Sequence, residues 1–292
     1  MSLVITSTAN PRIKAVAALS QPRERRLSGL CTIEGHDEVR LARDSGSAIR
    51  EVYLCPDLMR ASDLVFSETL RAAGVDLVEV SEAVMTKMAY REHPDAWLAV
   101  AESPDTDLAT FSARLRLRQA QSAARTGKQV DERPRTLLVL DSVEKPGNIG
   151  AVLRSADAAG IDGIIASNCR TDMGNPNVVR ASKATVFTIP VAECSPDEAL
   201  GWITHEGITL YAASPEGSIT HWEIDFSRPG GTAVAFGAER EGLGDFWLTQ
   251  AATRVSIPME GVVNSLNIAQ SATLVAYEAL RQYLSSFKEP AS

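Results

Sequence analysis

Residues 255–283 read VSIPMEGVVNSLNIAQSATLVAYEALRQY, and this stretch determines how the second half of the chain is interpreted. A short apolar strand is expected to end at Ile257, because Pro258 has no backbone N–H with which to continue a sheet. A loop containing glycine and asparagine follows, and Ser265 to Asn267 open a long helix. A helix start has unpaired N–H groups and a loop has free carbonyls, so this turn suits a ligand site better than a core.

The composition is that of an ordinary globular protein. The chain has 292 residues, of which 45% are hydrophobic and 23% charged, and this length predicts about two domains. No run approaches the roughly 18 apolar residues of a membrane span, and the N-terminal residues lack a secretory pattern, so we expect a cytoplasmic protein. The four cysteines and four histidines are scattered without metal-ligand spacing, so we expect neither a metal site nor a disulfide framework.

The net charge is −8, yet two stretches are locally basic. The second of them runs from residue 114 to residue 135. Phosphate contacts act within a Debye length of about 8–10 Å, so local patches on an acidic chain can bind a polyanion. A solvated surface and a charged linker would have the same composition. Charge alone therefore does not decide between binding of a polyanion and a basic surface with no ligand. The basic side chains of the first stretch are Arg12, Lys14, Arg23, Arg25 and Arg26.

The hydrophobic pattern divides the chain into two α/β domains and a connecting segment. Residues 1–104 alternate short apolar strands with helices, which predicts a small α/β domain. Residues 105–135 are rich in Arg, Ala and Gln with a weak apolar stripe, which indicates a basic linker that is mobile near residues 126–128. Residues 136–292 predict an open, mostly parallel sheet with helices on both faces. Ligands of such sheets bind at the carboxyl ends of the strands.

Three loops rich in glycine and polar residues follow apolar strands of the second domain. In residues 146–150, Asn148 is placed to cap the next helix, and Arg154 lies off the buried stripe of that helix. In residues 237–244, glycine right after a strand allows close approach of a ligand. This loop lacks the G-x-G-x-x-G pattern, so a dinucleotide site is a weak interpretation. The third loop, residues 258–267, completes a set that favours a nucleotide-like ligand.

These loops resemble the signature motifs of the SpoU/TrmH family, the RNA ribose 2′-O-methyltransferases within the SPOUT superfamily. The N-terminal half is similar to the auxiliary domain of that family, which resembles ribosomal protein L30e, through residues 5–14 and 33–35. The segment Val179-Arg180-Ala181-Ser182 is also similar to a family segment. The motif positions are Asn148, Gly150 and Arg154, then Gly237, Glu239 and Gly242, then Ile257-Pro258-Met259, and last Ser265-Leu266-Asn267.

The resemblance implies a C-terminal trefoil knot that holds S-adenosylmethionine, and a homodimer in which the partner chain completes each site. It implies that Arg154 activates the ribose 2′-hydroxyl. Because arginine is a poor base, Arg154 could instead lower the pKa of the hydroxyl by its charge or work with an RNA phosphate. The implied cofactor contacts are Gly237, Ala238, Ile257, Met259 and Leu266. The implied supporting residues are Asn148, Glu239, Ser265 and Asn267. The expected RNA contacts are Arg12, Lys14, Arg23, Arg25, Arg26 and Arg180.

The chain departs from the family pattern at three places. Ala184 stands where the family usually has glycine, residues 95–97 replace a glycine-containing turn, and residues 112–135 extend the usual linker. We interpret this basic extension as disordered rather than as added RNA-binding surface. The L30e-like domain favours 23S rRNA as the substrate, including the possibility of an antibiotic-resistance enzyme. The alternatives are a tRNA methyltransferase and a non-catalytic knotted RNA-binding protein, whereas a nucleotide-cofactor oxidoreductase is disfavoured.

Overall fold

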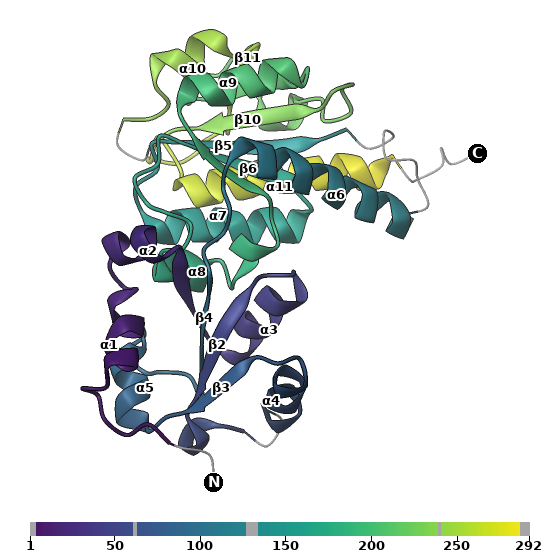
Figure 1. Cartoon of the computed structure of the whole chain (residues 1–292). Helices are drawn as coiled ribbons and strands as arrows, with labels where there is room; N and C mark the ends of the chain where they lie inside the picture. The colour runs from purple at the N-terminus through teal and green to yellow at the C-terminus, as the bar shows by residue number, and fades with distance from the viewer. Residues whose placement is uncertain (1–3, 61–62, 127–133, 239–240, 287–292) are drawn as a thin grey trace. The chain divides into compact units, whose positions relative to one another are not determined.

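The computed structural model describes residues 4–60, 63–126, 134–238 and 241–286, with the side chains of 122–126 left aside. The chain divides into two compact units (Figure 1). The first consists of residues 1–104 and 172–188, and the second of residues 105–171 and 189–292. Residues 172–188, expected within the second domain, group with the first unit.

The second unit is built on a parallel sheet. Its strands are β5 (Thr136–Asp141), β6 (Gly163–Ser167), β7 (Val191–Cys194), β8 (Thr209–Ala213), β9 (Ile219–Thr220), β10 (Thr232–Phe236) and β11 (Thr253–Ser256). Within the described segments the sheet has seven strands in the order β7-β6-β5-β10-β8-β11-β9, and each neighbouring pair is parallel. All six residues of β5 are buried, as a central parallel strand covered on both faces requires. The predicted parallel α/β sheet is confirmed.

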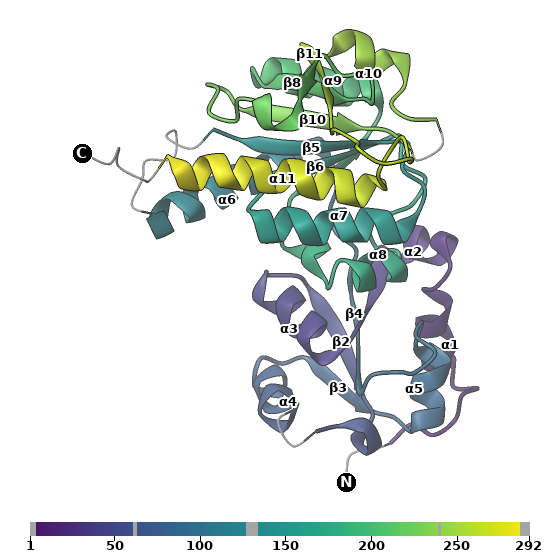
Figure 2. The ribbon, with the colours of Figure 1, turned by 180° about the vertical axis from the view of Figure 1, so that it is seen from behind.

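Helices cover both faces of this sheet (Figures 1 and 2). One face carries α6 (Leu108–Thr126), α9 (Pro196–His205) and α10 (Asp245–Gln250), and the other carries α7 (Pro146–Ala159) and α11 (Ile268–Ser285). A short 3-10 helix, η4 (His221–Glu223), follows β9. Alternate strand residues such as Leu137 and Val139 pack in one core with side chains of α6, α9 and α10. Their neighbours Leu138 and Leu140 are equally buried, because successive side chains of a strand point to opposite faces.

Helix α6 lies in the segment that was expected to be a linker. Phe111 and Leu115 of this helix are 0% and 1% exposed and belong to the core of the second unit. Gly163 on β6 leaves room for them, since a Cβ there would lie 2.8 Å from the Phe111 ring. The first turns of α6, around Phe111 and Leu115, are therefore packed in the core and are not a linker. Residues 127–133, where part of the expected mobility falls, lie outside the described residues.

The first unit is a smaller α/β layer, as the sequence predicted. In its described residues, four strands follow the order β1-β4-β2-β3, with only the β2–β3 pair parallel. Its strands are β1 (Leu30–Glu34), β2 (Ile49–Leu54), β3 (Asp76–Glu79) and β4 (Trp97–Glu102). Its helices are α1 (Pro11–Ala18), α2 (Pro22–Ser28), α3 (His36–Asp44), η1 (Pro56–Leu58), α4 (Asp63–Ala72), α5 (Glu82–Met88), α8 (Pro176–Ala181) and η3 (Thr185–Phe187).

The backbone at position 184 has the conformation that favours the glycine expected there from the family resemblance. Ala184 is fully buried with φ of 63°, in the left-handed region, and Lys183 before it has φ of 55°. For a residue with a Cβ this region costs roughly 1–2 kcal/mol. The turn between α8 and η3 is therefore left-handed at Ala184, although glycine, which has no Cβ, would adopt this conformation at a lower cost.

Candidate active site

A pocket of about 410 Å³ lies at the carboxyl ends of β8, β10 and β11 and beside the start of α11. This is the edge of a parallel sheet at which ligands bind, and the volume is in the range of small-molecule sites. Strand ends and the loops after them supply its walls, so residues distant in the sequence meet there. The predicted residues that line it are Gly237, Ala238, Ile257, Met259, Ser265 and Leu266.

The turn after β10 explains why position 237 is glycine. A Cβ on Gly237 would lie 2.0 Å from the carbonyl oxygen of Gly242 and 2.2 Å from the nitrogen of Leu243. The turn is closed by the Gly242 N–H, which donates to the carbonyl of Ala238 at 2.9 Å. The glycine therefore lets the chain fold back upon itself and form one wall of the pocket. Glu239, predicted as a supporting residue, lies outside the described residues.

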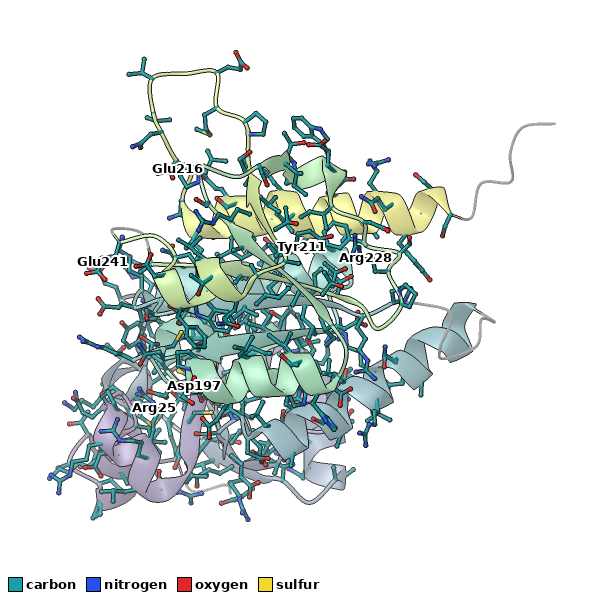
Figure 3. All side chains as sticks on the ribbon, turned by 90° about the horizontal axis from the view of Figure 1, so that it is seen from above. Arg25, Asp197, Tyr211, Glu216, Arg228 and Glu241 are labelled. Atoms are coloured by element: carbon teal, nitrogen blue, oxygen red, sulfur yellow. The ribbon has the colours of Figure 1, made fainter. Side chains whose placement is uncertain are left out.

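Two carboxylates in the pocket walls were not predicted. Glu216 follows β8 and Glu241 follows β10, and both lie at the same end of the strands (Figure 3). Ser214, Asn264 and Ser271 add polar groups to the lining. The turn after β8 could have been found, since its Ser-Pro-Glu-Gly run follows an apolar strand as the other three loops do.

Asn267 joins the starts of α11 and α7. It caps α11, because its Oδ1 accepts from the Ala269 N–H at 2.8 Å and its own N–H donates to Gln270 Oε1 at 3.3 Å. Its Nδ2 donates to Oδ1 of Asn148 at 3.3 Å. The expected cap role of Asn148 is wrong, because α7 begins at Pro146 and Asn148 lies inside its first turn.

The amide of Asn148 has an unused donor. Its Nδ2 is buried and has no hydrogen-bond partner among the described residues. A buried N–H without a partner costs about 1–3 kcal/mol, so such groups are rare outside functional sites. Asn148 is therefore held by Asn267 through its oxygen, while its Nδ2 has no partner among the described residues.

Arg154 is exposed on α7, away from the pocket. The stripe of Ile149, Val152 and Ala156 is buried as predicted, and Arg154 lies off it. Arg154 follows Asn148 by six residues, which is about 9 Å along the helix axis. In the described chain it is absent from the walls of the 410 Å³ pocket. It lines instead an open hollow of about 450 Å³ with Ser155, Ala158, Thr273, Leu274 and Tyr277 of α7 and α11.

The expected RNA-contacting side chains of the first unit differ in availability. Arg25 is 2% exposed and pairs with Asp172 at 2.6 Å, and it also donates to the carbonyl of Leu19 at 2.8 Å. It is a structural residue, and the prediction that it contacts RNA is corrected. Arg12 is bound by Glu51 and Asp76, so its charge is largely neutralised. The exposed members of the set are Lys14, Arg23, Arg26 and Arg180.

Metal ligation and thiol chemistry are two further roles that titratable side chains could have in the described part of the chain. Within it, no three His, Cys, Asp or Glu side chains gather in a group that could hold a metal ion. Burial raises the pKa of the Cys169 thiol to about 12 and that of Cys194 to about 11, so both are protonated and weak nucleophiles at neutral pH. Among the described helices, none combines the length and apolarity needed to cross a membrane.

Comparisons with known proteins agree with this geometry. The SpoU rRNA Methylase family model matches residues 135–277, and the MRM3-like substrate binding domain matches residues 10–99. An uncharacterized tRNA/rRNA methyltransferase of Synechocystis is 32% identical over 95% of this chain and 93% of its own length. The 23S rRNA (uridine(2479)-2′-O)-methyltransferase of Streptomyces viridochromogenes is 30% identical over 96% of this chain and 92% of its own.

A solved structure extends the likeness to three dimensions. The AdoMet-bound rRNA methyltransferase of Sinorhizobium meliloti superposes with a TM-score of 0.80 at 27% identity, covering 96% of this chain and 98% of that one. The similarity thus spans both units and all three motif loops, and it confirms the resemblance read from the sequence. The chain belongs to the SpoU rRNA methylase family and is a member of this group of RNA methyltransferases.

Proposed function

We propose that this protein transfers the methyl group of S-adenosylmethionine to a ribose 2′-hydroxyl of 23S rRNA. The observation that carries the proposal is the meeting of Gly237, Ile257 and Leu266 in one pocket at the carboxyl edge of the sheet. The name of the Streptomyces relative, which covers almost the whole chain, supports 23S rRNA as the substrate. A ribosomal RNA substrate also supports the expected cytoplasmic location.

The pocket suits S-adenosylmethionine in its chemistry. Apolar side chains such as Ile257 and Leu266 offer surface to an adenine ring, and the loop glycines expose backbone groups to its edges. The carboxylates of Glu216 and Glu241 give the walls a negative charge that favours a cationic ligand. When bound, the cofactor supplies a methyl group activated by its sulfonium charge.

The residues at the helix starts would act on the ribose. Displacement at a methyl carbon requires alignment of the reacting atoms, and the weakly acidic hydroxyl must be polarised or deprotonated. The free N–H groups of Asn148, held in place by Asn267, can orient the ribose or an adjacent phosphate. As a cation, Arg154 would stabilise the developing alkoxide or bind a phosphate rather than remove the proton.

We further propose that a second copy of the chain completes the site. Arg154 lies outside the cofactor pocket of its own chain, beside Leu274 and Tyr277, which are 41% and 49% exposed. A homodimer packed on this α7–α11 face would cover both apolar side chains and bring Arg154 toward the partner's pocket. The trefoil knot stays a proposal as well. It is supported by the path of the chain from β11, across residues 257–267, to α11 beside α7.

Mapping of 2′-O-methylation tests the function. RNA from a strain that lacks the protein should lose one ribose methylation in 23S rRNA and regain it when the gene is restored. A missing methyl group in tRNA would instead support the tRNA alternative. Purified protein that binds RNA but neither binds S-adenosylmethionine nor labels RNA would support the non-catalytic alternative.

A further inference from the structure

We propose that Tyr90 and Arg180 of the first unit form a platform on which one unpaired base of the RNA substrate stacks. This inference rests on the proposed function, because it assumes that RNA is the substrate. It adds a base-binding position made by residues 90 positions apart in the sequence. We call these two side chains the Tyr90–Arg180 platform.

The platform is an exposed pair of planar groups. The Tyr90 side chain is 48% exposed, and the guanidinium carbon of Arg180 lies 5.9 Å from the centre of its ring. Arg180 is also exposed, and its Nη2 donates to Oδ1 of Asn177 at 3.0 Å, one turn earlier on α8. Among the described residues no carboxylate forms an ion pair with Arg180, and its charge acts on the buried Glu34 only from a longer distance.

The backbone beneath the tyrosine is held firmly. The Tyr90 N–H donates to Oε1 of Glu34, and the Arg91 N–H donates to Oε2 of the same carboxylate at 3.3 Å. Nη2 of Arg91 returns to the Glu34 carbonyl at 3.2 Å. Glu34 is only 8% exposed, so a buried carboxylate fixes the loop while the ring remains at the surface. A backbone held in this way loses little conformational freedom when a ligand binds.

The surroundings are cationic. Arg91 Nη2 and Lys183 Nζ both lie 3.2 Å from Oε1 of Glu38, a carboxylate that is 4% exposed. The Lys183 side chain itself is 56% exposed. Asp37 adds a third carboxylate that interacts with Lys183 and with Arg40. The cationic side chains Arg40, Arg91, Arg180 and Lys183 therefore outnumber the carboxylates of Glu34, Glu38 and Asp37 by one, which leaves a small net positive charge near the ring. Phosphates that flank a stacked base would be attracted to this charge.

An RNA base is the ligand that matches both features. Proteins that read unpaired RNA stack its bases on aromatic rings and on arginine planes. A cation–π pair that only fastens α8 to the rest of the unit would also place Arg180 over Tyr90. The two roles can be told apart by experiment. Loss of a purely structural contact would lower the stability of the protein but leave the RNA affinity of the folded protein unchanged, whereas loss of a stacking platform would lower the RNA affinity.

The test measures RNA affinity by fluorescence anisotropy, with an end-labelled RNA hairpin as the probe. A second hairpin carries 2-aminopurine in its loop and reports stacking through quenching. Tyr90→Ala should weaken hairpin binding roughly 5- to 150-fold, the range for loss of one stacked base. Tyr90→Phe should stay within about twofold of the wild type, since it keeps the ring. The matched control is Arg71→Ala, an exposed arginine on α4 outside the platform, which should bind within about twofold.

Arg180 supplies a second variant that does not depend on Tyr90→Ala folding. Arg180→Lys keeps the charge but not the planar guanidinium, so it should bind the hairpin more weakly and quench 2-aminopurine less than the wild type.

The platform is refuted if folded Tyr90→Ala and Arg180→Lys both bind and quench as the wild type does. It is also refuted if Arg71→Ala loses as much affinity as they do. Wild-type protein that binds no RNA at all would overturn the proposed function together with the platform. If Tyr90→Ala and Arg180→Lys transfer methyl groups normally and bind RNA with wild-type affinity, the platform alone is overturned and the proposed function stands.

Discussion

Arg154 is the single residue on which the proposed chemistry depends most. Arg154→Ala should lower methyl transfer to RNA by at least about 100-fold, because it removes the charge that would stabilise the developing alkoxide. Cofactor affinity should stay the same, since Arg154 is absent from the walls of the described pocket. Calorimetry and transfer of a radiolabelled methyl group separate the two effects. The control is Arg170→Ala, whose side chain is 85% exposed, and a wild-type rate for Arg154→Ala would contradict the assignment.

Gly237 tests the cofactor pocket at the same scale. Gly237→Ala places a Cβ 2.0 Å from a backbone oxygen, so the turn after β10 must shift and with it one wall of the pocket. We expect the affinity for S-adenosylmethionine to fall by more than about 10-fold, equivalent to about 1.4 kcal/mol, as measured by calorimetry. Gly201→Ala is the matched control, because a Cβ there meets no atom within 4 Å. Equal affinities in the two variants would show that the turn does not shape the site.

At the scale of the element, α6 is the clearest departure from expectation. Phe111→Ala should lower the free energy of unfolding by roughly 3–5 kcal/mol, because it leaves a cavity in the core. Leu117→Ala on the same helix should change it by less than about 0.5 kcal/mol, since Leu117 is 59% exposed. Urea titration followed by circular dichroism measures both. If both variants lost similarly little free energy of unfolding, α6 would not be a packed element and the segment would be a linker.

The loop between β11 and α11 is the element that we expect to respond most to the cofactor. Residues 257–267 have no regular structure and are largely exposed, and Val263 is 63% exposed. Several of them also line the pocket, so a bound ligand would order the loop. A protease that cleaves after glutamate should cut at the exposed Glu260, and saturating S-adenosylmethionine should slow this cut several-fold. Cleavage after Glu68 on α4 serves as the control and should not respond to the cofactor.

At the scale of the whole molecule, the α7–α11 face predicts the oligomeric state. Light scattering should give about twice the chain mass of 31.4 kDa. Tyr277→Asp would bury an unpaired charge in the proposed interface, so it should yield monomers and abolish methyl transfer. Leu64→Asp, on an exposed position of α4, should leave both unchanged. A wild-type monomer with full activity would rule out a site shared between two chains.

Much of the fold and of the site was predictable because its signals are local. A buried parallel strand such as β5 is a continuous apolar run, and the turn after a strand needs its glycine within a few residues. The assignment of Gly237, Ile257 and Leu266 to one ligand site came from the resemblance of these loops to the SpoU/TrmH family. The sequence also predicted that Arg154 lies off the buried stripe of its helix, since that depends only on helical periodicity.

Only the tertiary structure decided what depends on partners distant in the chain. Arg25 reads as an RNA-binding cation in the sequence, but Asp172, 147 residues away, makes it a buried structural residue. Asn148 reads as a helix cap, but Asn267, 119 residues away, takes its oxygen and leaves its N–H groups free. Local pattern thus determined the α/β class, the strands and the motif loops. Long-range contact decided which charged and polar groups remain available for function, because a side chain is neutralised or buried by whatever the fold brings beside it.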